Sequence, residues 1–235
     1  MKKRIAAIQS NYIPWKGYFD LINMADEFIL YDDVQYTKKD WRNRNRIKTP
    51  NGLIWLTIPV KVKGRFHQKI RETAVSDYRW NRRHWNSIVC NYSRAKHFVA
   101  FRDVFEELYL DCNERLLSHI NYRFLKTICR ILGIDTRISF VMDYNLTEKG
   151  KTAKIIEMCK KAGAGEYIVG PAAKAYIEED LFRQENIKLR YMDYNGYPKY
   201  NQLYPPFTHH VSIIDLILNE GSDASKYMLS LENRT

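Results

Sequence analysis

The 235-residue chain lacks several features that would assign it to a class at once. Its four cysteines form no C-x-x-C pair and have no histidine cluster beside them: Cys90, Cys112, Cys129 and Cys159. This spacing argues against a zinc site and a disulfide framework, and it favours reduced thiols. No hydrophobic run is long enough for a signal peptide or a membrane span, so we expect a cytoplasmic protein.

The sequence also lacks both glycine-rich signatures of nucleotide binding, G-x-G-x-x-G and G-x-x-x-x-G-K. Acidic residues are scarce in its first part. Residues 1–100 contain 20 Lys/Arg against 8 Asp/Glu, whereas residues 101–235 contain 18 against 19. An excess of positive charge in residues 1–100 is typical of a protein that binds nucleic acid, an anionic membrane surface or a phosphorylated small molecule. The alternative is a basic surface that only keeps the protein soluble.

Hydrophobic patterns alternate between strand and helix along the chain. Strands are predicted at 4–9, 27–31, 53–60, 137–142, 166–169 and 187–192. Helices are predicted at 15–25, 152–161, 172–184 and from a cap at Ser212 to Leu218, with a longer helical stretch at 77–132. We therefore expect one α/β domain over 1–235, with a Rossmann-like, mainly parallel sheet, helices on both faces and a helical insertion at 77–132.

Polar loops follow several of the predicted strands, at 9–11, 32–35, 170–171 and 193–200. In parallel sheets, ligands bind beyond the carboxyl ends of the strands, so these loops are expected to converge on one cleft. Gln9 and Asn11 flank Ser10 at the start of a helix, an arrangement suited to a phosphate or carboxylate. The alternative for these residues is a helix cap without a ligand.

The segment 31–46 carries the strongest functional signal. Asp32 and Asp33 directly follow an apolar strand, and two adjacent acids are costly unless a cation binds them. Either carboxylate can serve as a general base, bind a divalent ion, or form a structural ion pair with Arg42 or Arg44. No metal site is assigned here.

Residues 41–46 alternate cations and amides behind a tryptophan. On a strand, Arg42, Arg44 and Arg46 share one face, and Asn43 and Asn45 share the other. Guanidiniums bind phosphate in a bidentate manner, and Trp41 can stack on a base or a sugar. A solvated basic loop is the alternative interpretation.

Later segments add weaker candidates. His84, in the aromatic and basic stretch 80–85, is a candidate acid or base, although a lone histidine is more often structural. Gly170 and Pro171, with Lys174 and Tyr176, are candidates for a tight, phosphate-facing turn. Tyr200 and Gln202 lie in a loop rich in tyrosine that is predicted to line a ligand, with aromatic packing as the alternative.

Six motifs together resemble the WbqC-like protein family. They are residues 8–15 with 17–19, residues 32–35, 41–48, 55–60, 170–176 and 212–216. Trp15 and Gln35 lie in these motifs and join the candidate substrate-binding residues. The resemblance covers nearly the whole chain, with Val169 where a small polar residue is expected. It implies a role in bacterial O-antigen or other surface-polysaccharide synthesis, for which glycine transfer to an amino sugar has been proposed.

Together, the residues and the resemblance lead to a hypothesis of a transferase that forms an amide on a nucleotide-activated amino sugar. The arginines would bind the diphosphate, and Asp32, Asp33 or His84 would act as the base. No Cys or Ser lies in a recognisable nucleophile setting, which favours direct attack on an activated donor. Glycyl-tRNA and an adenylate made from ATP are both open as donors. The rival hypotheses are a non-catalytic nucleic-acid-binding protein and a scaffold in polysaccharide assembly.

Overall fold

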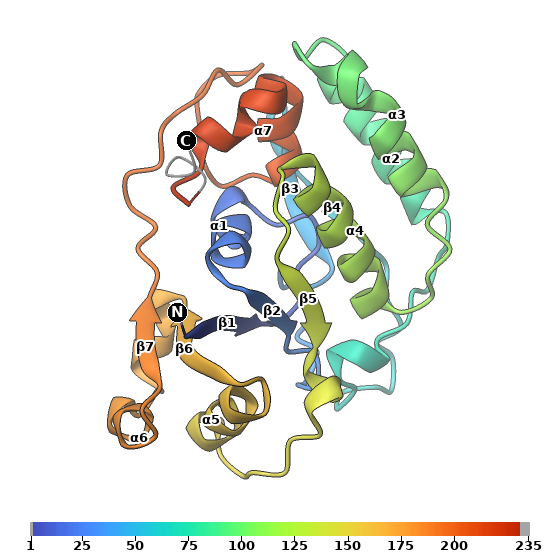
Figure 1. Ribbon diagram of the computed structural model, residues 1–235. Helices are drawn as coiled ribbons and strands as arrows, with labels where there is room; N and C mark the ends of the chain where they lie inside the picture. The colour runs from blue at the N-terminus through green and yellow to red at the C-terminus, as the bar shows by residue number, and fades with distance from the viewer. Residues whose placement is uncertain (1, 231–235) are drawn as a thin grey trace.

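A five-stranded sheet forms the centre of the computed structural model, which describes residues 2–230 (Figure 1). Its strands are β1 (Lys3–Ile8), β2 (Glu27–Leu30), β5 (Arg137–Phe140), β6 (Ala164–Val169) and β7 (Lys188–Tyr191). They lie in the order β5-β2-β1-β6-β7, and every neighbouring pair is parallel. The predicted α/β class and its mainly parallel sheet are thereby confirmed.

The direction in which the chain crosses the sheet changes once. From β1 the chain proceeds outward to β2 and β5, and it then returns to place β6 and β7 on the other side of β1. Counted along these strands alone, the order is 3-2-1-4-5, as in doubly wound sheets. The switch between β1 and β6 is the place where such sheets leave a crevice at their carboxyl edge.

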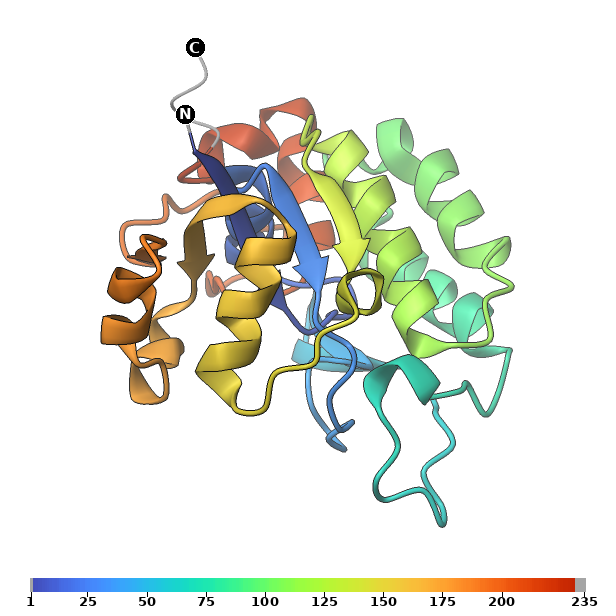
Figure 2. The ribbon, with the colours of Figure 1, turned by 60° about the horizontal axis from the view of Figure 1, so that its bottom comes forward.

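Alternate residues of the strands pack into two separate hydrophobic cores, one on each face of the sheet. Ala6, Phe28 and Ile168 point into a large core that contains α1 (Lys16–Met24), α4 (Leu117–Ile131) and α7 (Ile213–Glu220). Ile5 and Ile29 point the other way, into a smaller core under α5 (Lys151–Lys161) and α6 (Glu179–Gln184). Figure 2 shows α5 on the near side of the sheet. Helices therefore cover both faces, as the sequence predicted.

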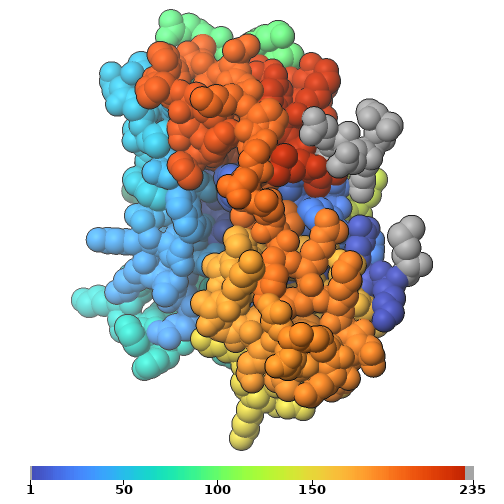
Figure 3. All heavy atoms as spheres, turned by 90° about the vertical axis from the view of Figure 1, so that its left-hand side faces the viewer, coloured from blue at the N-terminus to red at the C-terminus, as the bar shows by residue number. Residues whose placement is uncertain are grey.

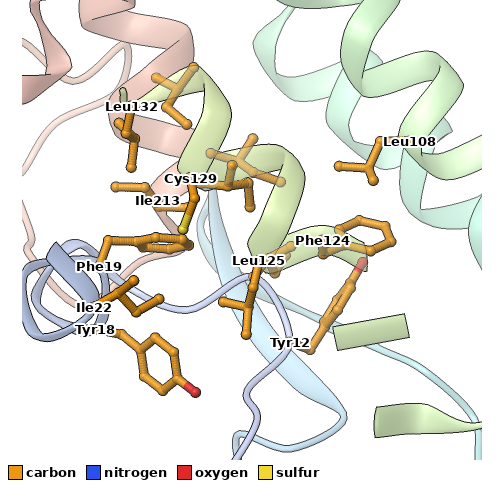
Figure 4. Packing of buried hydrophobic residues seen from close by; sticks show 14 of the residues in the cluster. Tyr12, Tyr18, Phe19, Ile22, Leu108, Phe124, Leu125, Cys129, Leu132 and Ile213 are labelled. Atoms are coloured by element: carbon orange, nitrogen blue, oxygen red, sulfur yellow. The ribbon is translucent and has the colours of Figure 1, made fainter. Parts of the chain in front are cut away.

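The predicted helical stretch 77–132 consists of α2 (Trp80–Tyr92), α3 (Phe98–Leu110) and α4. In Figure 1, α4 lies between the sheet and the outer pair α2–α3. Figure 4 shows Phe19 and Ile22 of α1 packed against Leu125 and Cys129 of α4. The three helices thus share the large core of the sheet. No helix within residues 2–230 is long and apolar enough to cross a bilayer.

An antiparallel hairpin, β3 (Arg44–Thr49) and β4 (Gly52–Thr57), stands apart from the parallel sheet. Gly52 adopts a positive φ of 108° at the Asn51-Gly52 turn, which a residue with a Cβ rarely tolerates. Ile47 and Leu56 on the inner face are buried in the large core. The strand predicted at 53–60 therefore belongs to this hairpin and ends at Thr57.

One predicted helix is divided in the structure. Residues 172–184 form a short 3-10 helix at Pro171–Ala175 and then α6. Between them, Ile177 is buried in the smaller core and the N–H of Glu178 donates to Oγ1 of Thr152 at 3.3 Å. Packing of this turn against α5 outweighs the local helical pattern. Further 3-10 helices span Ile70–Glu72, Val141–Tyr144 and Gly221–Tyr227.

Candidate active site

A cavity of about 660 Å³ opens at the carboxyl ends of β1 and β6, where the strand order switches. We call it the switch-point cleft. Ile8 and Gln9 line it from β1, and Val169 and Gly170 line it from β6. Lys151 lines a further wall, at the start of α5. Its volume lies within the range of small-molecule sites.

Two lysines give the cleft its positive charge. Lys151 and Lys154 lie in the first turns of α5, the former exposed and the latter half-buried. Nζ of Lys151 lies 5.5 Å from the ring centroid of Tyr176. The helix begins after Gly150 (φ 101°) without a side-chain cap, so its first N–H groups add to the positive character of this wall.

Tyrosine rings line a further part of the cleft, beside apolar side chains such as Leu21 and Ile155. Tyr31, Tyr167 and Tyr176 contribute their side chains, and the Tyr167 hydroxyl donates to the carbonyl of Ala7 at 3.3 Å. Burial raises the pKa of Tyr31 and Tyr176 above that of a free phenol. Both therefore stay neutral at physiological pH, as hydrogen-bond donors whose rings can stack on a flat ligand.

Asp33 lines a smaller pocket of about 260 Å³ that shares Tyr31, Val34 and Lys154 with the cleft. Its Oδ1 accepts from Nζ of Lys69 at 2.8 Å and from Nε of Arg71 at 2.6 Å. Burial opposes ionisation, but the two cations outweigh it and lower the pKa of Asp33. A carboxylate that is ionised at physiological pH thus stands next to the cleft.

Asp32 is placed quite differently from its neighbour. Its carboxylate is fully buried, where it accepts from the N–H of Ser10 at 2.8 Å and from the hydroxyl of Ser118. Burial raises the pKa of Asp32, although these hydrogen bonds oppose the rise. Asp32 holds the loop that follows β1, and the two adjacent carboxylates do not form a joint site.

Arg42 also holds the loop that follows β1. Its guanidinium donates to Oδ1 of Asn11 and to Oε1 of Gln9 at 3.2 Å. Asp40 lies 3.7 Å away as a further partner. Arg42 therefore fixes the side chain of Gln9, which lines the switch-point cleft, but does not itself line it.

The two remaining arginines of the segment lie on the outer face of β3. The Cζ atom of Arg44 lies 4.0 Å from the ring centroid of Trp55, and that of Arg46 lies between Trp55 (5.3 Å) and Trp41 (5.6 Å). The three guanidiniums therefore do not form the single receptor that the alternation suggested, because Arg42 precedes β3 and has separate partners.

The asparagines of the segment point inward. Nδ2 of Asn43 donates to the carbonyl of Ile58 at 2.8 Å. Nδ2 of Asn45 donates to the carbonyls of Tyr12 and Ile13 at 3.1 and 3.0 Å. These buried amides attach the hairpin to the rest of the chain. In β3, Asn45 lies on the inner face, and Arg44 and Arg46 lie on the outer face, as the alternation predicted.

His84 lies in the aromatic core, apart from the cleft. Its Nε2 faces the carbonyl of Thr57 at 3.2 Å and its Nδ1 the hydroxyl of Tyr12 at 2.9 Å. Burial lowers the pKa of His84 to about 4, so the ring is neutral at physiological pH. Because a carbonyl can only accept, Nε2 carries the proton and the imidazole anchors the end of β4.

Five other predicted ligand residues share a smaller pocket of about 190 Å³: Asn11, Trp15, Trp41, Asn45 and Arg46. Gln35 donates to the carbonyl of Phe66 at 2.9 Å. Among the residues that line the cleft, the structure brings together only Gln9 and Gly170 of those predicted.

Lys174, Tyr200 and Gln202 have partners of their own. Nζ of Lys174 lies 5.1 Å from the ring centroid of Tyr191. The Tyr200 hydroxyl and Nε2 of Gln202 both donate to Oδ1 of the buried Asp215, at 2.6 and 2.9 Å. These two side chains hold the 193–211 loop in place rather than line one of the larger cavities.

Lys151, Lys154 and Tyr31 were not among the predicted site residues. A Gly-Lys pair before an amphipathic helix was the available signal at Gly150-Lys151. Within residues 2–230, no group of three or more His, Cys, Asp or Glu is placed to hold a metal ion.

Comparison with known proteins supplies the family. The model of the WbqC-like protein family matches residues 9–227. Rv1507c, an uncharacterized protein of Mycobacterium tuberculosis, is 50% identical over 226 residues, which cover 96% of this chain and 97% of that protein. No solved structure matches the chain. With a match over almost its entire length, the chain belongs to the WbqC-like protein family.

Proposed function

We propose that this protein transfers a glycyl or other acyl group to the amine of a nucleotide-activated amino sugar for O-antigen or another surface polysaccharide. The observation that carries the proposal is the switch-point cleft, which combines the lysines of α5 with tyrosine rings at the carboxyl edge of a parallel sheet. The association of the WbqC-like family with O-antigen-related functions supports the biological setting.

The lining of the cleft suits the parts of a nucleotide sugar. Lys151 and Lys154, at the N-terminal end of α5, are suited to the diphosphate. Tyr31 and Tyr176 offer rings against which a base or a sugar can stack. The amide of Gln9, held by Arg42, is available to a sugar hydroxyl.

The adjoining pocket suits the acceptor amine. In the proposed step, the amine nitrogen attacks the carbonyl carbon of the activated acyl group, a new C–N bond forms, and the bond from that carbon to the leaving oxygen breaks. The ionised carboxylate of Asp33 binds the amine and accepts the proton that it releases. Asp33 then passes this proton to the leaving ribose oxygen when the donor is glycyl-tRNA, and releases it to water when the leaving group is AMP.

Both donors place the reaction in the cytoplasm, where aminoacyl-tRNA, ATP and nucleotide sugars are made. A tRNA donor requires an additional surface for nucleic acid, whereas an adenylate requires ATP as a second small substrate. The arrangement of the cleft does not depend on this choice.

The test is product formation from defined substrates. The protein is incubated with a dTDP-amino sugar and, in separate reactions, glycyl-tRNA or glycine with ATP, and the sugar nucleotide is analysed by mass spectrometry. We expect a mass gain of one glycyl group with one of the donors. Lys154→Ala should lower kcat/KM by about 100-fold, because a charge-assisted contact to phosphate contributes about 1.5–3 kcal/mol.

Lys160→Ala is the matched control, since Lys160 lies on the same helix but pairs with Glu185 at 2.7 Å instead of lining the cleft. It should retain wild-type activity, because an exposed ion pair contributes little to stability. No mass gain with any donor, or equal losses in Lys154→Ala and Lys160→Ala, would contradict the proposal.

A further inference from the structure

We infer that the outer face of the β3–β4 hairpin binds single-stranded nucleic acid. Four side chains form this surface, which we call the hairpin platform: Trp41, Arg44, Arg46 and Trp55. The inference rests on their geometry and not on the proposed transfer reaction, and it concerns a surface separate from the switch-point cleft.

The platform follows from the pairing of the two strands. Arg46 and Trp55 are direct cross-strand partners, and Arg44 lies diagonally from Trp55 on the same face. The rings of Trp41 and Trp55 lie 5.4 Å apart at an angle of 42°. Both tryptophans remain substantially exposed, 40% for Trp41 and 42% for Trp55. Large aromatic rings at this exposure are available to stack on a ligand.

The opposite end of the same face is closed. Nζ of Lys48, further along β3, donates to Oε1 of Gln202 at 2.8 Å and to the carbonyls of Tyr204 and Pro206. A loop of the chain thus covers Lys48, whereas Arg44 and Arg46 are only half-buried. Nη2 of Arg44 donates to the carbonyl of Lys39. The outer N–H groups of a half-buried guanidinium suit an anionic oxygen of a ligand.

Further cations extend the platform in one direction. Lys38, Lys63 and Arg65 line an open hollow of about 720 Å³ beside the exposed ring of Phe66. Figure 3 shows residues 35–70, coloured blue to teal, along one edge of the visible face. The 20 Lys/Arg against 8 Asp/Glu of residues 1–100 give this region a positive field.

This combination selects the class of ligand. Single strands present unstacked bases, which stack on aromatic side chains in a sequence-tolerant manner, while arginines and lysines follow the phosphates. A duplex keeps its bases stacked inside and would leave the tryptophans without partners. A chain of nucleotides rather than one mononucleotide is favoured because the aromatic and cationic groups continue from the hairpin to the 62–68 loop.

The test is fluorescence anisotropy with labelled oligonucleotides of about ten nucleotides and the full-length protein. Single-stranded RNA, single-stranded DNA and a duplex of the same sequence are compared. We expect both or one of the single strands to bind at least tenfold more tightly than the duplex. Trp55→Ala should weaken single-strand binding by about tenfold, and Arg44→Ala should weaken it to a similar extent.

Arg183→Ala on α6 is the charge-matched control, because Arg183 is an exposed arginine far from the hairpin in the fold, paired with Asp180. It should change affinity by less than about twofold. Thermal unfolding confirms that each variant is folded, and Arg44→Ala decides the question should Trp55→Ala fail to fold. Duplex binding as tight as single-strand binding, or equal losses in Arg44→Ala and Arg183→Ala, would overturn the inference. If the single strands bind more tightly than the duplex, comparison of the RNA and DNA affinities identifies which of the two the protein prefers.

Discussion

The switch-point cleft and the hairpin platform use the same two kinds of side chain, cations beside aromatic rings. They differ in what surrounds those side chains. In the cleft, Lys151, Lys154 and the tyrosines stand around apolar strand ends. On the platform, Arg44 and Arg46 stack on tryptophans at an open strand face. Enclosure suits one small phosphorylated molecule, and an open face suits a longer chain.

The two regions also differ in how they are supported. The cleft is formed at the ends of β1 and β6 in a five-stranded sheet, where backbone pairing fixes both strands, and α5 supplies a further wall. The hairpin has two strands and depends on side-chain anchors, among them Asn45 on the carbonyls of Tyr12 and Ile13, and His84 on the carbonyl of Thr57. We expect the hairpin to loosen more readily than the cleft, since a two-stranded unit is marginal alone.

The largest expected difference between the regions is in salt dependence. Binding of a single strand to about four cations should weaken by about 50-fold between 50 and 200 mM salt, with a slope near −0.7 per phosphate contact. Binding of a nucleoside diphosphate in the cleft should weaken only a few-fold, because only Lys151 and Lys154 are involved. Titrations at four salt concentrations measure both slopes, and equal slopes would erase the distinction between the two regions.

Acid should weaken the anchor of the hairpin through His84. Because burial lowers the pKa of His84 from 6.5 to about 4, its neutral form stabilises the fold fully above pH 6.5 and this contribution is lost as the pH falls toward 4. The loss between pH 7 and pH 4.5 should be about 2 kcal/mol in the free energy of unfolding. Urea denaturation at several pH values measures it.

The comparison with His84→Gln isolates this contribution. The raised pKa values of the buried Asp32 and Asp215 act in the opposite sense, since their protonation on acidification favours the fold. Glutamine can still donate to the carbonyl of Thr57 but does not titrate. The variant should therefore lose stability less steeply on acidification than the wild type. Identical pH dependence in both proteins would show that His84 is not the responsible group.

The smallest of these effects concerns Asp33, at the wall shared by the cleft and its side pocket. Asp33→Asn should lower the rate of acyl transfer by about tenfold, because the amide cannot take the proton of the amine. Since Lys69 and Arg71 outweigh burial and lower the pKa of Asp33, the wild-type rate should not fall on its account between pH 7 and pH 5. Initial rates over this range test both statements. A rate that is unchanged in Asp33→Asn would remove the residue from the reaction.

Much of the fold follows from local patterns. Short apolar runs predicted the five strands of the sheet, because residues of these strands pack into the cores on its two faces. Ser212 was predicted as a cap, and its hydroxyl oxygen accepts from the N–H of Ile214 at 3.3 Å. The division of 172–184 was not visible, because it depends on a contact with Thr152 from another helix.

The site was less accessible to prediction. Gln9 and Gly170 follow strands whose carboxyl ends meet at the switch, so position in the pattern was sufficient to find them. Lys151 and Lys154 were missed because the Gly-Lys pair at the start of α5 does not reveal that this end of the helix lies opposite those strands. Asp32 and Asp33 are neighbours in sequence with separate surroundings, one buried against Ser10 and Ser118 and the other paired with Lys69 and Arg71.

The sequence by itself determined most of the segments that become strands and helices, the basic character of residues 1–100, and the family. Those properties depend on hydrophobic period, charge and motif, which are local. Only the tertiary structure decided the partners of the arginines. Arg42 donates hydrogen bonds to Gln9 and Asn11, whereas Arg44 and Arg46 lie over the ring of Trp55. The physical reason is that a side chain's partners come from elements far away in the chain, and their approach is fixed by the packing of the whole core.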